Sequence, residues 1–228
     1  MYKNIEILDK KRCKSLKFDT VSPFEIGKTM GVLPLGFNEV IDMAKYAPVI
    51  IMGDSDNLEF VAFGGISPQV TVFNDETIYT PMFTRTYPFL NVILKDTKEG
   101  IKSVIGIDNG EFCGTKKEKK IFSSNGTLEP LALEKIEMVR ELNRQRVISK
   151  KIIKELQKYD LLLKRYFTVN YKQESKVILD NFYIVNREKL MQLDDTIIAT
   201  WGKKGWITLL DIHLKSLVNF QKVVAPFY

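Results

Sequence analysis

The chain has 228 residues, 45% of them hydrophobic and 27% charged, which is an ordinary balance for a globular protein. A single histidine excludes every metal site that needs two, such as the HExxH zinc motif and the two-histidine iron triad. No apolar run approaches the ~20 residues of a membrane-spanning helix. Cys13 and Cys113 form no CxxC pair and are expected to be reduced structural thiols, with a bridge between them as the alternative. We expect no metal and no cofactor.

The N-terminal segment MYKNIEILDKKRCKSLKF carries no secretory signal, because no apolar stretch of about 7–15 residues follows its basic residues. We therefore expect a cytoplasmic protein. Export to the cell surface without a cleaved signal peptide is the alternative.

The net charge of +6 is unevenly spread along the chain. Residues 21–115 hold six basic and twelve acidic residues, whereas residues 116–165 hold fourteen basic and seven acidic residues. The basic region could face nucleic acid or another anionic surface, form a solvated face, or lie against the acidic part of its own chain. No aromatic residue is interleaved with Lys and Arg between 134 and 158, and no helix-turn-helix or zinc pattern is present. We expect no sequence-specific binding of nucleic acid.

Residues 1–115 have the pattern of short strands and turns, with β-branched apolar runs between Gly, Pro and Asp residues. A short amphipathic helix is expected at 37–46, and 49–63 is expected to form a hairpin. Gly64-Gly65 indicates a bend or bulge, and 95–100 a turn. The expected strands are 4–8, 49–52, 60–63, 70–73, 90–94 and 103–107.

The second half of the chain differs from the first in residue composition and in the spacing of its apolar residues. Residues 113–130 are rich in Gly, Lys and Ser and indicate a connecting loop. Residues 131–158 contain neither Gly nor Pro, and their apolar residues recur every three or four positions, which predicts a long amphipathic helix. The remaining expected elements are strands at 165–171 and 177–185, short helices capped by Asn186 and by Asp194 or Asp195, and a final helix at 206–223.

Strands first and helices later predict an α+β fold: a largely antiparallel or mixed β N-terminal half, the long amphipathic helix, short strands and a C-terminal helical segment. We expect one domain over 1–228. The alternative is a subdivision into a β-rich part, 1–115, and a helix-rich part, 131–228, joined by the loop 113–130.

Several segments, in order along nearly the whole chain, resemble one family. The most specific is 79–89, YTPMFTRTYPF, which is similar to the pattern Y-x-P-x-x-x-R-x-Y-P-F. The others are Leu33-Pro34-Leu35, Tyr46-Ala47-Pro48-Val49-Ile50, Ile107-Asp108, Phe122 through Gly126, Phe182 through Asn186 with Lys189-Leu190, and Gly205 through Asn219. Together they resemble the SapC-like family of bacterial surface-layer-associated proteins, from whose usual pattern Ala47 is a small departure.

The resemblance implies a role at bacterial surface layers and brings no established catalytic site with it. Relatives tend to be encoded near oxygenases and halogenases, which implies an accessory role. We therefore expect a non-catalytic protein that acts through contacts with a protein partner, such as a surface-layer or oxygenase-type protein. Non-specific nucleic-acid binding through the basic helix remains a further alternative.

One alternative is a small-ligand or enzyme pocket around Arg85, Tyr87 and Asp108. Arg85 lies among aromatic residues that include Tyr79 and Tyr87, where a guanidinium could bind a carboxylate or phosphate. The same residue could instead brace a proline-rich turn, and we expect it to be buried and paired, with Asp108 as a candidate partner. Asp108 could be a site carboxylate or part of an Asp-Asn-Gly turn.

The remaining candidate contacts lie in the second half. Trp201 and Trp206 flank Gly202-Lys203-Lys204-Gly205 and could form a partner patch or pin a helix corner into the core. His213 has apolar neighbours at helical spacing and could be a contact or a buried structural residue. The basic face of the long helix consists of Arg140, Arg144, Lys151, Lys154 and Lys158.

Overall fold

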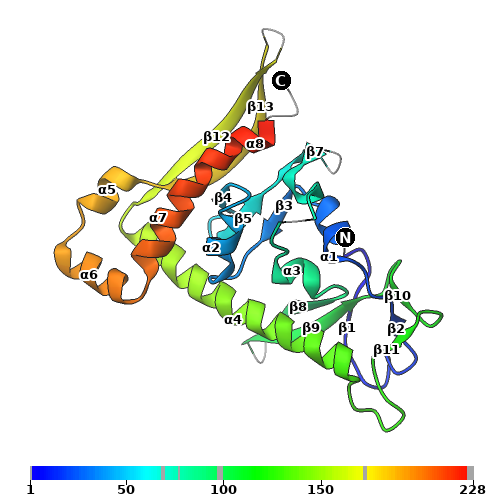
Figure 1. Cartoon of the computed structure of the whole chain (residues 1–228). Coiled ribbons are helices and arrows are strands. Elements are labelled where there is room, and N and C mark those ends of the chain that lie inside the picture. The colour runs from blue at the N-terminus through cyan, green and yellow to red at the C-terminus, as the bar shows by residue number, and fades with distance from the viewer. Residues whose placement is uncertain (1, 68–69, 77, 97–99, 172–173, 225–228) are drawn as a thin grey trace. The chain divides into compact units, whose positions relative to one another are not determined.

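The structure is a computed structural model that describes residues 2–67, 70–76, 78–96, 100–171 and 174–224 (Figure 1). Every strand pairing among these residues is antiparallel, and most of the helical residues follow the first nine strands. This confirms the predicted α+β class. The chain divides into two compact units, each built from two separate stretches of sequence: Met1–Ile26 with Met82–Arg144, and Gly27–Pro81 with Gln145–Tyr228.

The first unit contains two three-stranded sheets, with strand orders β1-β9-β8 and β10-β2-β11. Their apolar side chains share one core with the first half of the long helix, including Phe18, Phe89, Ile107 and Ile136. The elements are β1 (Ile5–Ile7), β2 (Lys17–Phe18), α3 (Met82–Arg85), β8 (Phe89–Asp96), β9 (Gly100–Asp108), β10 (Cys113–Gly114) and β11 (Lys119–Lys120), while α1 (Pro23–Lys28) crosses the unit boundary in sequence.

The predicted strands at 4–8, 90–94 and 103–107 are confirmed by β1, β8 and β9. The segment 113–130, expected to be a loop, carries the two-residue strands β10 and β11, because both find a backbone partner in β2. Of the predicted turn at 95–100, residues 97–99 lie outside the described residues, whereas Lys95 and Asp96 belong to β8 and Gly100 begins β9.

The second unit is built on a five-stranded sheet of order β12-β13-β4-β5-β3. The predicted hairpin at 49–63 is confirmed by the pairing of β4 with β5, and the predicted strand 49–52 coincides with β4. The strands are β3 (Val32–Pro34), β4 (Val49–Met52), β5 (Glu59–Phe63), β12 (Leu162–Tyr171) and β13 (Glu174–Val185), with β6 (Gly65–Ser67) and β7 (Val70–Thr71) in a separate pair.

The predicted strand at 70–73 is shorter than expected. β7 ends at Thr71, and a 3-10 turn, η1 (Val72–Asn74), follows. The Thr71 hydroxyl accepts a hydrogen bond from the Phe73 amide at 3.2 Å, so a local side-chain cap replaces the next rung of the strand ladder.

Helices cover the second unit's sheet, where α7 packs against β4 and β13 (Figure 1). The predicted caps are confirmed: the Asn186 side chain accepts from the Lys189 amide and Asp194 from the Thr196 amide. The predicted final helix is divided into three pieces. The helices are α2 (Glu39–Met43), α5 (Arg187–Met191), α6 (Asp195–Lys203), α7 (Trp206–Ser216), η2 (Leu217–Asn219) and α8 (Phe220–Val224).

The long helix α4 (Pro130–Lys158) confirms the prediction at 131–158 and is shared by both units. Its buried side chains include Ile136, Val139, Leu142, Ile152 and Leu156, which follow the spacing of three and four seen in the sequence. In the described part of the chain, no helix combines the length and the apolar composition needed to span a bilayer.

Candidate functional site

Tyr87 and Asp108 meet inside the first unit. Asp108 is the last residue of β9 and only 3% exposed. The Tyr87 hydroxyl donates to one carboxylate oxygen at 2.9 Å, and the backbone amides of Lys3 and Asn4 donate to the other at 3.0 and 2.9 Å. Burial, together with the neighbouring carboxylate of Asp108, raises the pKa of Tyr87. The carboxylate therefore holds the N-terminal strand of its own chain against β9.

Arg85 and Tyr79 have other surroundings. Arg85 ends α3 and is half-buried, and its backbone carbonyl accepts a hydrogen bond from Lys135 Nζ at 2.5 Å. Its candidate partner Asp108 is held by Tyr87 and the N-terminal amides. Tyr79 belongs to the second unit, where its hydroxyl donates to the buried Glu39 at 2.9 Å.

His213 is fully buried on α7 and links two strands of the second unit's sheet. Its Nδ1 lies 2.7 Å from the Val49 carbonyl oxygen, and the Val185 amide donates to its Nε2 at 3.2 Å. These contacts require a neutral ring with the proton on Nδ1. Burial lowers the pKa of His213 to about 4. Since β13 pairs with β4 at a single residue pair, the imidazole supplies part of the connection between these strands.

The basic face of α4 differs between its two halves. Arg140 pairs with Glu137 and Arg144 with Glu141, so each arginine has a carboxylate one turn earlier on the helix. In contrast, the exposed Lys151 and Lys154 have no carboxylate partner among the described residues. The uncompensated positive charge thus lies in the second half of the helix.

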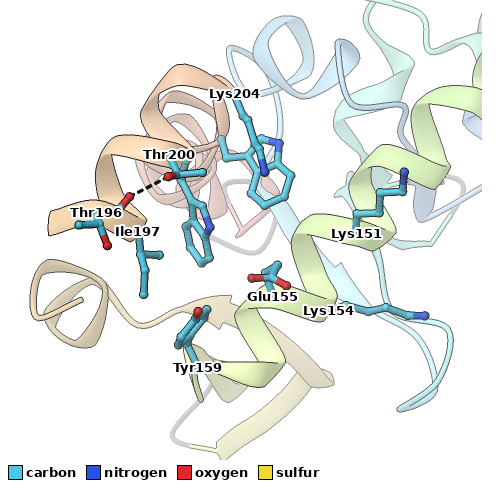
Figure 2. Close-up of a pocket in the computed structure, with 10 residues that line it drawn as sticks. Lys151, Lys154, Glu155, Tyr159, Thr196, Ile197, Thr200 and Lys204 are labelled. Carbon is cyan, nitrogen blue, oxygen red and sulfur yellow. Dashed lines mark hydrogen bonds between the residues drawn. The ribbon is translucent and has the colours of Figure 1, made fainter. Parts of the chain in front are cut away.

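Four of the predicted site residues, Trp201, Trp206, Lys151 and Lys154, surround one hollow of about 510 Å³ in the second unit (Figure 2). This volume falls within the range of about 300–1,000 Å³ typical of ligand pockets. We call it the aromatic–lysine hollow. Its lining residues are Lys151, Lys154, Glu155, Tyr159, Thr196, Ile197, Thr200, Trp201, Lys204 and Trp206.

Three aromatic rings form one wall of the aromatic–lysine hollow. Trp201 is 3% exposed and lies between the other two, with ring centroids 5.9 Å from Tyr159 and 5.8 Å from Trp206. Lys204 Nζ lies 4.7 Å from the Trp206 ring centroid, and Lys158 Nζ lies 4.9 Å from that of Tyr159. Both outer rings therefore already hold a cation from the same chain.

The turn between α6 and α7 positions this wall. Gly205 has a φ of 72°, in the left-handed region that glycine adopts without strain, and it allows α7 to begin immediately after α6. On α6, the Thr200 hydroxyl donates to the Thr196 carbonyl at 2.8 Å (Figure 2). One side of the hollow is thus an ordered helix corner that carries both tryptophans.

The α4 side of the aromatic–lysine hollow is charged. Glu155 projects from α4 toward α6, whereas Lys151 and Lys154 extend outward (Figure 2). With Lys204 on the opposite side, three cations and one carboxylate line the hollow. Such a site suits a ligand that combines an apolar group with negative charge.

Sequence reasoning missed Glu155, Tyr159 and the threonines of α6 as members of this site. A signal existed for two of them: Lys151, Glu155 and Tyr159 are spaced by four residues, which places them on one side of a helix. For the threonines no pattern in the sequence indicated the site.

A second hollow, of about 620 Å³, lies in the first unit and includes Arg140 and Arg144 of the predicted basic face. Its apolar lining includes Leu8, Ile105 and Phe122. Since both arginines are paired with glutamates, it has less uncompensated charge than the aromatic–lysine hollow.

Comparison with known protein families assigns the chain to one family. The model of the SapC family matches residues 8–223. No curated protein and no solved structure matches the chain. Within the described residues, no group of three His, Cys, Asp or Glu side chains is placed to hold a metal ion. Because the family match covers nearly the whole sequence, the protein belongs to the SapC family.

Proposed function

We propose that this protein is a non-catalytic surface-layer-associated or accessory protein of bacteria, that it acts through protein–protein contacts, and that the aromatic–lysine hollow is its contact surface. The partner in this proposal is a surface-layer or oxygenase-type protein. The observation that carries the proposal is that the half-buried Trp206 and Tyr159, backed by the buried Trp201, lie with uncompensated lysines around one hollow. Tryptophan and tyrosine dominate the energetics of protein interfaces, because they bury large areas at low conformational cost.

The aromatic–lysine hollow supports this proposal better than the Tyr87–Asp108 cluster supports a ligand pocket. The Asp108 carboxylate accepts three hydrogen bonds from its own chain, two of them from the N-terminal backbone. A ligand at that carboxylate would have to displace these bonds. At the hollow, by contrast, Lys151 and Lys154 are exposed. Trp206 is half-buried and therefore retains accessible surface.

Site-specific photo-crosslinking in the native bacterium tests the proposal. A benzoylphenylalanine at Thr200, which is exposed and lines the aromatic–lysine hollow, should give a discrete cross-linked protein that mass spectrometry identifies. The same group at Lys119, an exposed residue of β11, serves as the control. Trp206→Ala should abolish the adduct at Thr200. The proposal is wrong if Thr200 gives no adduct, or if Thr200 and Lys119 give the same adducts.

We also propose that the protein acts from the cytoplasm. Fractionation of the same cells, with mass spectrometry of the N-terminus, tests this location. Intact protein in the surface fraction would support export without cleavage instead.

A further inference from the structure

We infer that the segment bound by the aromatic–lysine hollow is an acidic stretch of polypeptide with one apolar or aromatic anchor residue. The inference rests on the proposed function, since it names the chemical class of the partner. Three features of the hollow support it: its net charge, its lysine-covered rings and its unpaired glutamate. A fourth is a row of lysines on α4 that runs from Lys151 past the lining of the hollow to Lys158.

The charge of the aromatic–lysine hollow favours an anion. Lys151, Lys154 and Lys204 line it against the single carboxylate of Glu155. Among the described residues, Lys151 and Lys154 have no carboxylate that neutralises them. Charge complementarity governs which partners approach such a surface, so a basic segment is repelled and an acidic one attracted.

The lysines over the outer rings disfavour two other ligand classes, ligand cations and stacked nucleic-acid bases. A cation-binding aromatic cage needs several free ring faces, but one face of Trp206 already carries Lys204 and one face of Tyr159 carries Lys158. Trp201 is buried between the two outer rings. Stacking of nucleic-acid bases needs the same free faces. Tyr159, Trp206 and Ile197 are half-buried and retain accessible apolar surface, which suits an apolar or aromatic anchor.

The lysines on α4 form a row that is longer than a small acid. Lys151, Lys154 and Lys158 are spaced by three and four residues, which places them on one side of the helix. At 1.5 Å per residue, their Cα atoms span roughly 10 Å along the axis. A single carboxylate reaches one of these cations, whereas several acidic side chains of an extended segment reach all of them.

Glu155 distinguishes a polypeptide from a nucleic acid. Its half-buried carboxylate projects toward α6 and has no hydrogen-bond partner among the described residues (Figure 2). A backbone amide of a bound peptide can donate to it. A phosphodiester backbone carries acceptors and negative charge, so it would be repelled at the same position.

Fluorescence anisotropy with purified protein tests the inference. The probe is a labelled peptide of about twelve residues, glutamates around a central tryptophan. Comparison probes replace the glutamates by lysines, or the tryptophan by glycine, and an oligothymidylate represents nucleic acid. We expect the acidic tryptophan peptide to bind most tightly, with an affinity that falls as salt is raised.

Two matched charge reversals localise the binding. The double variant Lys151→Glu with Lys154→Glu should bind the acidic peptide about tenfold or more weakly, because electrostatic attraction becomes repulsion. The control pair Lys119→Glu with Lys120→Glu changes the net charge equally at exposed residues that do not line the hollow, and it should change affinity less than about twofold. Thermal melting of each variant checks that it folds, and Lys151→Gln with Lys154→Gln should give an intermediate loss.

Three outcomes overturn the inference: tighter binding of the lysine peptide, tighter binding of oligothymidylate, or equal losses in the two charge-reversed pairs. These are distinguishable from failure of the proposed function. A cross-link from Thr200 to a neutral or basic segment of a partner would keep the proposed function and refute the acidic segment. Absence of any cross-link would contradict the proposed function whatever the peptides do.

Discussion

Acidification below pH 6.5 should destabilise this protein through His213. The imidazole is fully buried and neutral, with Nδ1 bonded to the Val49 carbonyl and Nε2 accepting from the Val185 amide. Burial lowers its pKa from 6.5 to about 4, against the opposing effect of the hydrogen bond to Val49. Protonation of the folded state would place a second N–H against the amide of Val185.

The size of the effect follows from proton linkage. An unfolded chain binds a proton at His213 below pH 6.5, whereas the folded chain binds it only near pH 4. The contribution is therefore fully present above 6.5 and is lost as the pH falls toward about 4. At ~1.4 kcal/mol per pH unit, the free energy of unfolding decreases by about 3 kcal/mol over this interval. Against typical stabilities of about 5–15 kcal/mol, this is a large fraction.

Urea unfolding measures the loss at about pH 7 and pH 4.5, in the parent and in His213→Gln. Carboxylates titrate in both proteins, so the difference between the two losses isolates the imidazole. We expect the parent to lose about 2–3 kcal/mol more than the variant. Because the chain has one histidine, its NMR signal can be titrated without overlap from another. A titration midpoint near 6.5, or parallel losses in the two proteins, would refute the reasoning.

Three further predictions concern buried contacts. Tyr87→Phe removes a donor from the buried Asp108 and should lower the free energy of unfolding by about 1–3 kcal/mol in urea. Gly64→Ala would place a Cβ atom 2.2 Å from the ring of buried Phe73, so a loss of about 1–3 kcal/mol is expected in thermal melting. Burial raises the pKa of Cys113 to about 12, so at about pH 8 iodoacetamide should label it, by mass spectrometry, only after denaturation.

The first two predictions have a control variant, and each of the three has an outcome that would contradict it. Tyr166→Phe changes an exposed residue and should be nearly neutral, so an equal loss at Tyr87 and Tyr166 would contradict the first prediction. A Cβ atom at Gly202 meets nothing within 4 Å, so Gly202→Ala should not destabilise the protein. If Gly64→Ala melted at the same temperature as Gly202→Ala, the second prediction would be contradicted. Labelling of Cys113 in folded protein at the denatured rate would contradict the third.

The sequence alone was enough for several local elements and for the family. The spacing of apolar residues in 131–158 predicted α4, and the β-branched run 49–52 predicted β4. The caps at Asn186 and Asp194 were also correct. These features depend on residues within a few positions of one another, so their physical cause is contained in a short window of sequence.

The local sequence pattern predicted two segments less well, because a backbone pairing or a side-chain cap changed their secondary structure. β10 and β11 exist because β2, far away in sequence, offers them hydrogen-bond partners. The strand expected at 70–73 ended early because the Thr71 hydroxyl capped a 3-10 turn. β2 lies far outside the segment 113–130, whereas the Thr71 cap is local and competes with the strand propensity of the same residues.

Only the tertiary structure decided what the singled-out side chains contact. From the sequence, His213 could be either a contact residue or a buried structural residue. In the structure, α7 places its two ring nitrogens between Val49 and Val185. Trp201 lies next to Tyr159 because α6 packs near the end of α4. The basic segment 134–158 contains no aromatic residue, so the aromatic rings beside its lysines come from other parts of the chain. These contacts join residues that are distant in the chain, and they are fixed by the packing of whole elements rather than by any local preference.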